Sequence, residues 1–115
     1  MIQAIKRQYQ EDFERINKKF LESHNSQSYT TIHSRIIDEH LKSLWVSCNI
    51  PEEISLIAVG GYGREELFPY SDIDILILIP NKNTKETNEK VSSFITACWD
   101  IGMKIGHSVR TLKDT

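Results

Sequence analysis

The longest unbroken apolar run in the chain, residues 75–79, limits the fold more than any other feature. It is far shorter than the roughly 20 residues that a membrane-spanning helix needs, and Pro80 follows it directly. A run of this length, with β-branched isoleucines and a proline stop, is typical of a buried strand. We therefore predict a strand over residues 72–79 and expect it to lie in the centre of a sheet.

Helical and strand patterns surround this run. Apolar residues three or four apart predict helices over residues 2–20, 32–48 and 91–99, and two further segments, 54–59 and 103–111, predict a buried strand and a half-exposed strand. Residues 23–28 and 81–88 are expected to be loops, with Ser28, Thr30 or Thr31 capping the second helix and Gly102 ending the third. This order of elements predicts an α+β fold, with helices and strands mixed along the chain.

Composition sets broad limits on function. The chain has 115 residues, enough for one domain, and its 14 basic and 16 acidic side chains leave a net charge of −2. This balance argues against nucleic acid or an anionic membrane as a partner. Charged side chains throughout residues 1–20 exclude the apolar segment of a secretory signal, so we expect a cytoplasmic protein. Cys48 and Cys98 form no closely spaced metal motif, and we expect both to pack in the core.

Residues 59–74 carry the candidate chemistry. Gly60, Gly61 and Gly63 come at the end of a predicted strand. Because glycines lack side chains, their backbone N–H groups can approach and bind an anion such as a phosphate chain. Arg64 comes next, and it is expected either to contact phosphate oxygens or to brace the loop by pairing with a neighbouring glutamate.

Asp72 and Asp74 open the predicted central strand. Residues two apart in a strand project from the same face, so the two carboxylates are expected to stand side by side and to repel each other unless a cation neutralises them. Hard oxygen ligands with no cysteine or histidine beside them favour Mg²⁺ or Mn²⁺ over zinc. Eleven positions separate Gly61 from Asp72, few enough for one loop to join the glycines to the carboxylates. Together they predict a metal–nucleotide site suited to displacement at phosphorus.

Each part of this site also has a purely structural explanation. A Gly-Gly pair is usually a tight turn, and an Asp-x-Asp pair is more often solvated surface. Their combination around an apolar strand favours a functional site. Other phosphate motifs do not fit, because Glu66 stands where a dinucleotide motif requires a third glycine and no Gly-Lys-Ser/Thr sequence is present.

The motif resembles a known family. Gly-Gly followed by Asp-x-Asp resembles the polymerase-β-like nucleotidyltransferase superfamily. In detail, the segment is similar to the motif of the bacterial PII-protein uridylyltransferase/uridylyl-removing enzymes, and it reads Gly60-Gly61-Tyr62-Gly63-Arg64-x-Glu66-Leu67-x-Pro69-x-Ser71-Asp72-Ile73-Asp74. Residues 99–111 resemble the next landmark of these enzymes. The resemblance implies a polymerase-β-like core with a small mixed sheet and two N-terminal helices. We expect a helical segment over residues 1–50 and a partial nucleotidyltransferase domain over residues 51–115.

The resemblance also implies an activity. It would be a Mg²⁺-dependent transfer of UMP from UTP to a tyrosine of the PII signalling protein, with release of pyrophosphate, in nitrogen regulation. By position, Gly60 and Gly61 would hold the triphosphate, Ser71 would touch it, and Asp72 and Asp74 would be the catalytic metal ligands.

One position departs from the superfamily pattern. A third carboxylate normally comes from a neighbouring strand, here around residues 105–110, but the sequence offers Gly106, His107 and Ser108. Either two carboxylates suffice, or His107 or a residue beyond Thr115 completes the metal shell.

Enzymes of this family are several times longer, with a hydrolase domain that removes UMP and domains that sense small molecules. We therefore expect the chain to be an N-terminal fragment that is inactive alone. Two alternatives stay open: a nucleotidyltransferase for another acceptor, either a small molecule or another protein, and a non-catalytic nucleotide-binding module.

Overall fold

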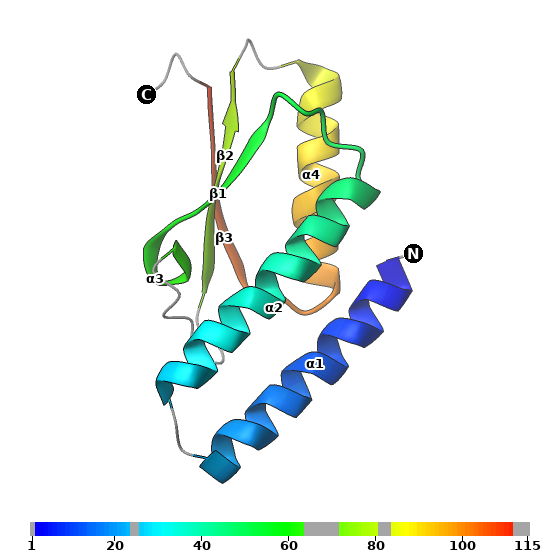
Figure 1. The fold of residues 1–115 in the computed structure, drawn as a ribbon. Helices are drawn as coiled ribbons and strands as arrows, with labels where there is room; N and C mark the ends of the chain where they lie inside the picture. The colour runs from blue at the N-terminus through cyan, green and yellow to red at the C-terminus, as the bar shows by residue number, and fades with distance from the viewer. Residues whose placement is uncertain (1, 24–25, 64–71, 81–83, 112–115) are drawn as a thin grey trace.

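The chain forms helices on one side of a small sheet in a computed structural model that describes residues 2–23, 26–63, 72–80 and 84–111. Helices and strands follow one another in the order predicted, with one additional helical turn after the first strand. The elements are α1 (Ile2–Ser23), α2 (Ser26–Ser47), β1 (Ser55–Ala58), α3 (Gly60–Gly63), β2 (Ile73–Ile79), α4 (Lys85–Asp100) and β3 (Ile105–Thr111) (Figure 1).

The sheet is mixed, with strand order β1-β2-β3. β1 runs antiparallel to β2, and β3 runs parallel to it. The predicted central position of the apolar strand is confirmed, as is the α+β class. Because β2 and β3 begin at the same end of the sheet and β1 finishes there, the glycines after β1 and the acidic residues that open β2 meet at one end.

The two faces of the sheet differ sharply. Residues 73, 75, 77 and 79 of β2 are buried, and the residues between them are only half-buried. The buried isoleucines join one hydrophobic core with α2 and α4, to which α2 contributes Ile37, Leu41 and Leu44. Asp74 therefore lies on the face of the sheet that points away from the helices.

α1 and α2 lie side by side as an antiparallel hairpin (Figure 1), and α1 joins the main core through Tyr9. Trp45 of α2 packs edge-on against Phe94 of α4, with ring centroids 5.0 Å apart. α2 shares its core with the sheet. The division predicted near residue 50, between a helical segment and a partial nucleotidyltransferase domain, stays a prediction. The expected burial of cysteine is confirmed for Cys98, where burial raises the pKa of the thiol to about 12, while Cys48 is half-buried.

Several predicted boundaries and burials are wrong. α2 already begins at Ser26, so the expected loop over residues 23–28 is shorter, and Thr30 and Thr31 lie inside the helix rather than at its start. Serine and threonine favour loops locally, but packing of the following apolar face against α1 and the core overrides that preference. α4 likewise begins at Lys85, where the Thr84 hydroxyl accepts a hydrogen bond from the backbone N–H of Thr87.

The prediction of a buried strand over residues 54–59 is also wrong in its burial. Ile54 is buried, but within β1 only Leu56 is partly buried, and Ile57 is 38% exposed. β1 lies at the edge of the sheet, and Ile57 pairs with Leu76 on the face away from the helices. Ile32, placed on the apolar stripe of the second helix, is 46% exposed, while its neighbours Thr30, His33 and Ser34 are buried.

A buried polar pair fastens the helical hairpin. His40 Nε2 of α2 lies 2.9 Å from Asp12 Oδ2 of α1, and both side chains are about 90% buried. Gln8 and Arg15 donate to the other carboxylate oxygen. Burial by itself raises the pKa of the Asp12 carboxyl, but the hydrogen bonds from His40 and Gln8 and the attraction of His40 and Arg15 outweigh it, so this pKa lies below its ordinary value.

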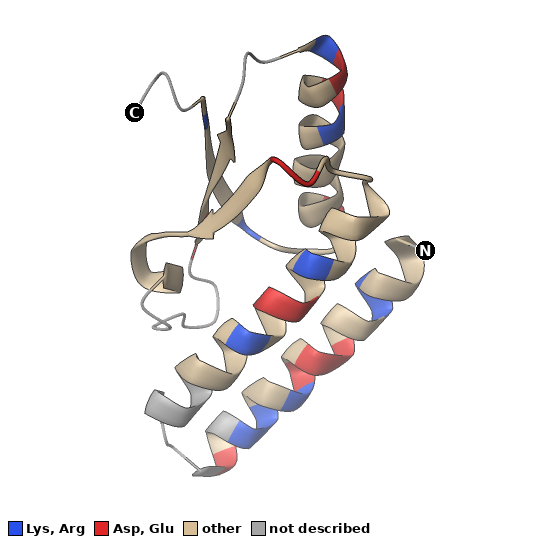
Figure 2. Ribbon diagram, turned by 45° about the horizontal axis from the view of Figure 1, so that its top comes forward, with Lys and Arg blue, Asp and Glu red and all other residues tan. Residues whose placement is uncertain are grey.

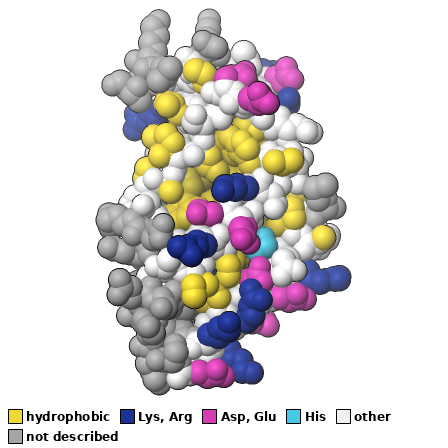
Figure 3. Space-filling model, viewed as in Figure 1, with side chains coloured by type: hydrophobic (Ala, Val, Ile, Leu, Met, Phe, Trp, Pro, Cys, Tyr) yellow, Lys and Arg dark blue, Asp and Glu magenta, His cyan; other side chains and the backbone are white. Residues whose placement is uncertain are grey.

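Charge is distributed unevenly over the fold. Lysine, arginine, aspartate and glutamate are frequent along α1, α2 and α4, whereas the strands carry few of them (Figure 2). The space-filling view shows hydrophobic side chains in the middle of one face and charged side chains over the helical hairpin (Figure 3). Among the described residues, none of the helices combines the length and the apolar character that crossing a membrane requires.

The buried pair yields a first prediction. Asp12→Asn is expected to lower the free energy of unfolding at pH 7 by about 1–3 kcal/mol, because it weakens a buried hydrogen-bonded pair. A depressed folded-state pKa stabilises the fold above the unfolded pKa of about 4, and this contribution is lost as the pH falls through the folded-state value. Urea unfolding at neutral and acidic pH should therefore show the wild type losing its advantage over the variant in acid.

Arg15→Ala is the matched control. Arg15 donates to the same carboxylate, but its side chain is 61% exposed, so its removal should change stability by less than about 0.5 kcal/mol. A deficit for Asp12→Asn that is equally large in acid and at neutral pH would contradict this role for the Asp12 carboxylate.

Candidate functional site

Asp74 lies between two glycines. Gly60 follows β1, and Gly106 is the register partner of Asp74 in β3. A β-carbon built on Gly60 would lie 3.0 Å from Asp74 Oδ2, and one built on Gly106 would lie 2.7 Å from Asp74 Oδ1. Each oxygen of the carboxylate therefore lies against a backbone that has no side chain.

Backbone bonds hold the glycines in this position. The Val59 N–H donates to the Asp74 carbonyl oxygen at 3.1 Å, so the end of β1 is fixed on β2 immediately before Gly60. Gly60 has a φ of +61°, a left-handed conformation that favours glycine. The Gly63 N–H then donates to the Val59 carbonyl oxygen at 3.0 Å, which closes the single helical turn of α3. The glycine segment is thus a helical turn rather than an open loop.

Asp72 directly precedes β2, at the same end of the sheet as Gly60 and Asp74. Ile73, between the two acidic residues, is 3% exposed and points into the core, which leaves Asp72 and Asp74 on the opposite side. The Asp72 side chain is 58% exposed, and its Oδ1 lies 3.3 Å from Nζ of Lys104. An exposed pair of this kind contributes little stability, about 0–1 kcal/mol.

Two predicted site residues, Arg64 and Ser71, lie outside the described residues, and their proposed phosphate contacts stay predictions. Gly61 lies within α3, next to Gly60. The predicted meeting of the glycine segment and the acidic pair is observed for Gly60 with Asp74.

His107 does not belong to this site. It pairs with Ile75, on the helix side of the sheet, and its ring packs against Trp99 of α4 with centroids 6.0 Å apart. Because β-strand side chains alternate between faces, His107 points away from the Asp74 side, so the suggestion that it completes a metal shell is wrong. In the part of the chain that the structure describes, no three histidine, cysteine or acidic side chains gather as a metal cluster.

Sequence reasoning missed the partner of Tyr62. This residue of α3 is 5% exposed, and its hydroxyl donates a hydrogen bond to Asp38 Oδ1 of α2. Burial, and then the Asp38 carboxylate, raise the pKa of the Tyr62 phenol well above its ordinary value, so the hydroxyl stays protonated. An aromatic residue between glycines was the available signal, but the distance of 24 positions to Asp38 hid the partner.

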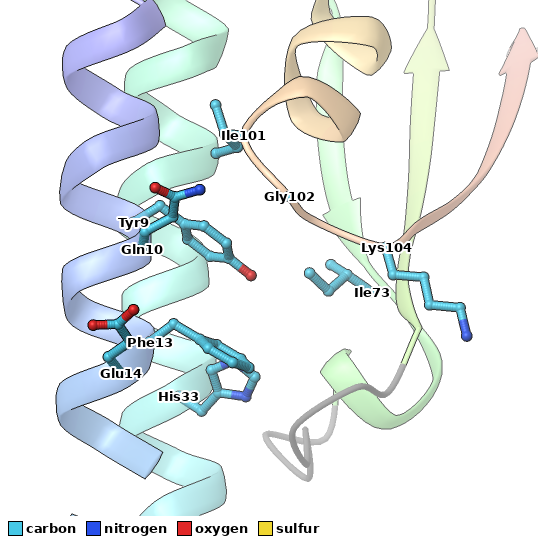
Figure 4. A pocket seen from close by; sticks show the side chains of 9 residues that line it. All are labelled: Tyr9, Gln10, Phe13, Glu14, His33, Ile73, Ile101, Gly102 and Lys104. Atoms are coloured by element: carbon cyan, nitrogen blue, oxygen red, sulfur yellow. The ribbon is translucent and has the colours of Figure 1, made fainter. Parts of the chain in front are cut away.

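A cleft of about 570 Å³ lies beside the site, between the helical hairpin and the end of the sheet. Tyr9, Phe13 and His33 extend from the helices toward Ile73 and Lys104 (Figure 4). Burial raises the pKa of Tyr9 to about 12. Since the cleft is on the Ile73 side of β2, it is separate from the face that carries Asp74.

Comparison with known sequences identifies the fold family. A sequence model described as "Nucleotidyltransferase domain" matches residues 34–105, which is more than half of the chain. The chain belongs to the nucleotidyltransferase family. The match begins within α2 and includes Asp38, Gly60 and both acidic residues of the site.

Two curated relatives of this nucleotidyltransferase domain carry the same name, "Bifunctional uridylyltransferase/uridylyl-removing enzyme". The protein from Nitrosospira multiformis is 36% identical over 97% of the chain, and that from Burkholderia mallei is 49% identical over 69% of it. The resemblance to these enzymes is thereby confirmed. The aligned regions span only 13% and 9% of the lengths of the two relatives. No solved structure gives a significant match.

The glycine contacts of this nucleotidyltransferase domain yield a second prediction. Gly106→Ala should displace the Asp74 carboxylate or spread the strands, because the new methyl group would overlap Oδ1. We expect a loss of about 1–3 kcal/mol in the free energy of unfolding and a changed ¹³C carboxylate resonance of Asp74.

Ser108→Ala, two residues further along β3 on the same face and exposed, is the control and should alter stability by less than about 0.5 kcal/mol. If Gly106→Ala left both the unfolding free energy and the Asp74 resonance at their wild-type values, the close packing of Asp74 between glycines would be refuted.

Proposed function

We propose that this nucleotidyltransferase domain binds UTP with Mg²⁺ and transfers UMP to a tyrosine hydroxyl of a PII signalling protein. The new bond joins the hydroxyl oxygen to the α-phosphorus, the bond from that phosphorus to the β-phosphate oxygen breaks, and pyrophosphate leaves. The hydroxyl proton passes to solvent. The observation that carries the proposal is the Asp74 carboxylate held against Gly60 at the end of the sheet where Asp72 also lies.

The donor set fits a divalent cation. Carboxylate oxygens are the ligands that Mg²⁺ and Mn²⁺ prefer, and both acidic residues lie on the side of the sheet away from the helices. Asp72 is paired with an exposed lysine, a weak interaction that a divalent cation can replace. Asp72 and Asp74 would be the ligands. Bound there, the cation would neutralise triphosphate charge and activate the attacking hydroxyl.

The other residues of the site would hold the nucleotide. The backbone of Gly60 and Gly61 permits close approach of a triphosphate, since neither glycine has a side chain of its own. Arg64 and Ser71 are proposed to contact phosphate oxygens. Two carboxylates, or these two with a ligand beyond Thr115, would complete the metal shell.

The names of the relatives support uridylyl transfer as the reaction. PII as the acceptor follows from the resemblance of the motif around residues 60–74. UTP and a PII protein would be met in the cytoplasm, and the role would be in nitrogen regulation. Because the aligned regions span at most 13% of the relatives named above, we propose that the 115 residues alone bind nucleotide but do not turn it over.

Asp74→Asn gives a third prediction. The affinity of the chain for Mg²⁺–UTP, measured by isothermal titration calorimetry, should fall at least about 10- to 100-fold, since loss of even an indirect metal partner has effects of that size. Asp100→Asn, which removes the same charge from an exposed position at the end of α4, should leave the affinity unchanged. Equal affinities for Asp74→Asn and the wild type would refute the metal assignment.

A transfer assay tests the acceptor. The 115 residues can replace the aligned segment of the Nitrosospira multiformis enzyme, and the product can be incubated with α-³²P-labelled UTP and purified PII. Label on PII is expected. Label on a different acceptor would indicate another nucleotidyltransferase activity, and binding of nucleotide without a labelled product would indicate a binding module.

A further inference from the structure

Tyr62 is the one residue of α3 with a side chain, because the turn consists of Gly60, Gly61, Tyr62 and Gly63. Glycine loses more conformational freedom on ordering than any other residue. A turn made almost entirely of glycine therefore needs an external anchor if it is to hold one shape. Tyr62 is 5% exposed and belongs to the main hydrophobic core, so it is placed to be that anchor.

Asp38, the acceptor of the Tyr62 hydrogen bond, lies on a helix that is held in place. The Tyr62 hydroxyl donates to Asp38, and the adjacent residue, Ile37, is fully buried in the core shared with β2. Two positions further along α2, His40 pairs with Asp12 of α1. Asp38 is therefore held by a helix that is fixed on two sides, against the core and against α1.

The backbone on either side of Tyr62 adjoins the site of the Asp74 carboxylate. Gly60 contacts the Asp74 carboxylate, and the Gly63 N–H is bonded to the Val59 carbonyl oxygen. Tyr62 lies between these two fixed points. A shift of its ring would move the backbone on both sides, including the segment that faces Asp74.

We propose that Tyr62, through its hydrogen bond to Asp38, is the positioning residue that sets the glycine turn against Asp74 for nucleotide binding. This inference rests on the proposed function, because it assigns the turn to the triphosphate. It makes α2 part of the nucleotide site although α2 contributes no residue to the chemistry.

The test uses the 115-residue chain with Mg²⁺–UTP as the probe. Tyr62→Phe removes only the hydroxyl, and Asp38→Ala removes only the acceptor. Each should weaken Mg²⁺–UTP binding about tenfold, the effect of losing one hydrogen bond to a charged group, and the double variant should be no weaker than either single one. Asp38→Asn keeps an acceptor oxygen and should lose at most about threefold.

Amide hydrogen exchange supplies a readout that does not depend on nucleotide. Exchange at the Gly63 N–H, which is bonded to the Val59 carbonyl oxygen, should accelerate in Tyr62→Phe and Asp38→Ala, while exchange in α4 stays at the wild-type rate. Tyr9→Phe, which removes the hydroxyl of another buried tyrosine, is the control and should affect neither the turn nor binding. If Tyr62→Phe does not fold, Asp38→Ala and Asp38→Asn carry the comparison.

The outcomes separate the two proposals. Failure of the wild type to bind Mg²⁺–UTP would overturn the proposed function, and the positioning role with it. Binding by the wild type with equally tight binding by Tyr62→Phe would overturn the positioning role alone. Faster exchange in the turn with unchanged affinity would also overturn the positioning role, because the Tyr62–Asp38 hydrogen bond would then stabilise only the fold.

Discussion

The contact between the Asp74 carboxylate and the glycines on either side is the constraint on which the site depends. Gly106 belongs to the neighbouring strand and Gly60 to the turn after β1, so three separate segments must converge for both carboxylate oxygens to meet bare backbone. The parallel pairing of β2 with β3 and the antiparallel pairing of β1 with β2 produce that convergence. Larger residues at either position would displace the carboxylate and, with it, the proposed cation site.

The helices pack on the face of the sheet opposite Asp74. Alternation along β2 sends the isoleucines toward α2 and α4 and leaves Asp74 on the other side, so the same seven-residue strand builds both the core and the site. The Asp12–His40 pair fixes α1 on α2, and the Tyr62–Asp38 bond joins α2 to the glycine turn. Through these bonds the N-terminal hairpin, although distant in sequence, is connected to the backbone that faces Asp74.

Much of this arrangement can be predicted from the sequence because it follows local periodicity. The apolar run of β2, the helical stripes, Gly102 as a helix terminator and the approach of Gly60 to the acidic pair all depend on short-range patterns. The exposure of β1 could not be predicted in this way, because it depends on which strand lies at the edge of the sheet. The partner of Tyr62 could not be predicted either, because Asp38 is 24 positions away. The face on which His107 lies depends on the register of β3 against β2, which periodicity alone leaves undetermined.

Paramagnetic broadening by Mn²⁺ would test the central claim most directly, because the effect falls steeply with distance from the ion. In ¹⁵N-labelled chain at substoichiometric Mn²⁺, the amide signals of Gly60, Asp74 and Gly106 should broaden first, while those of Val46 and Ser93 on the helices should stay sharp. Uniform broadening, or broadening centred on the acidic residues of α1, would show that the ion does not bind at Asp72 and Asp74 and would contradict the account.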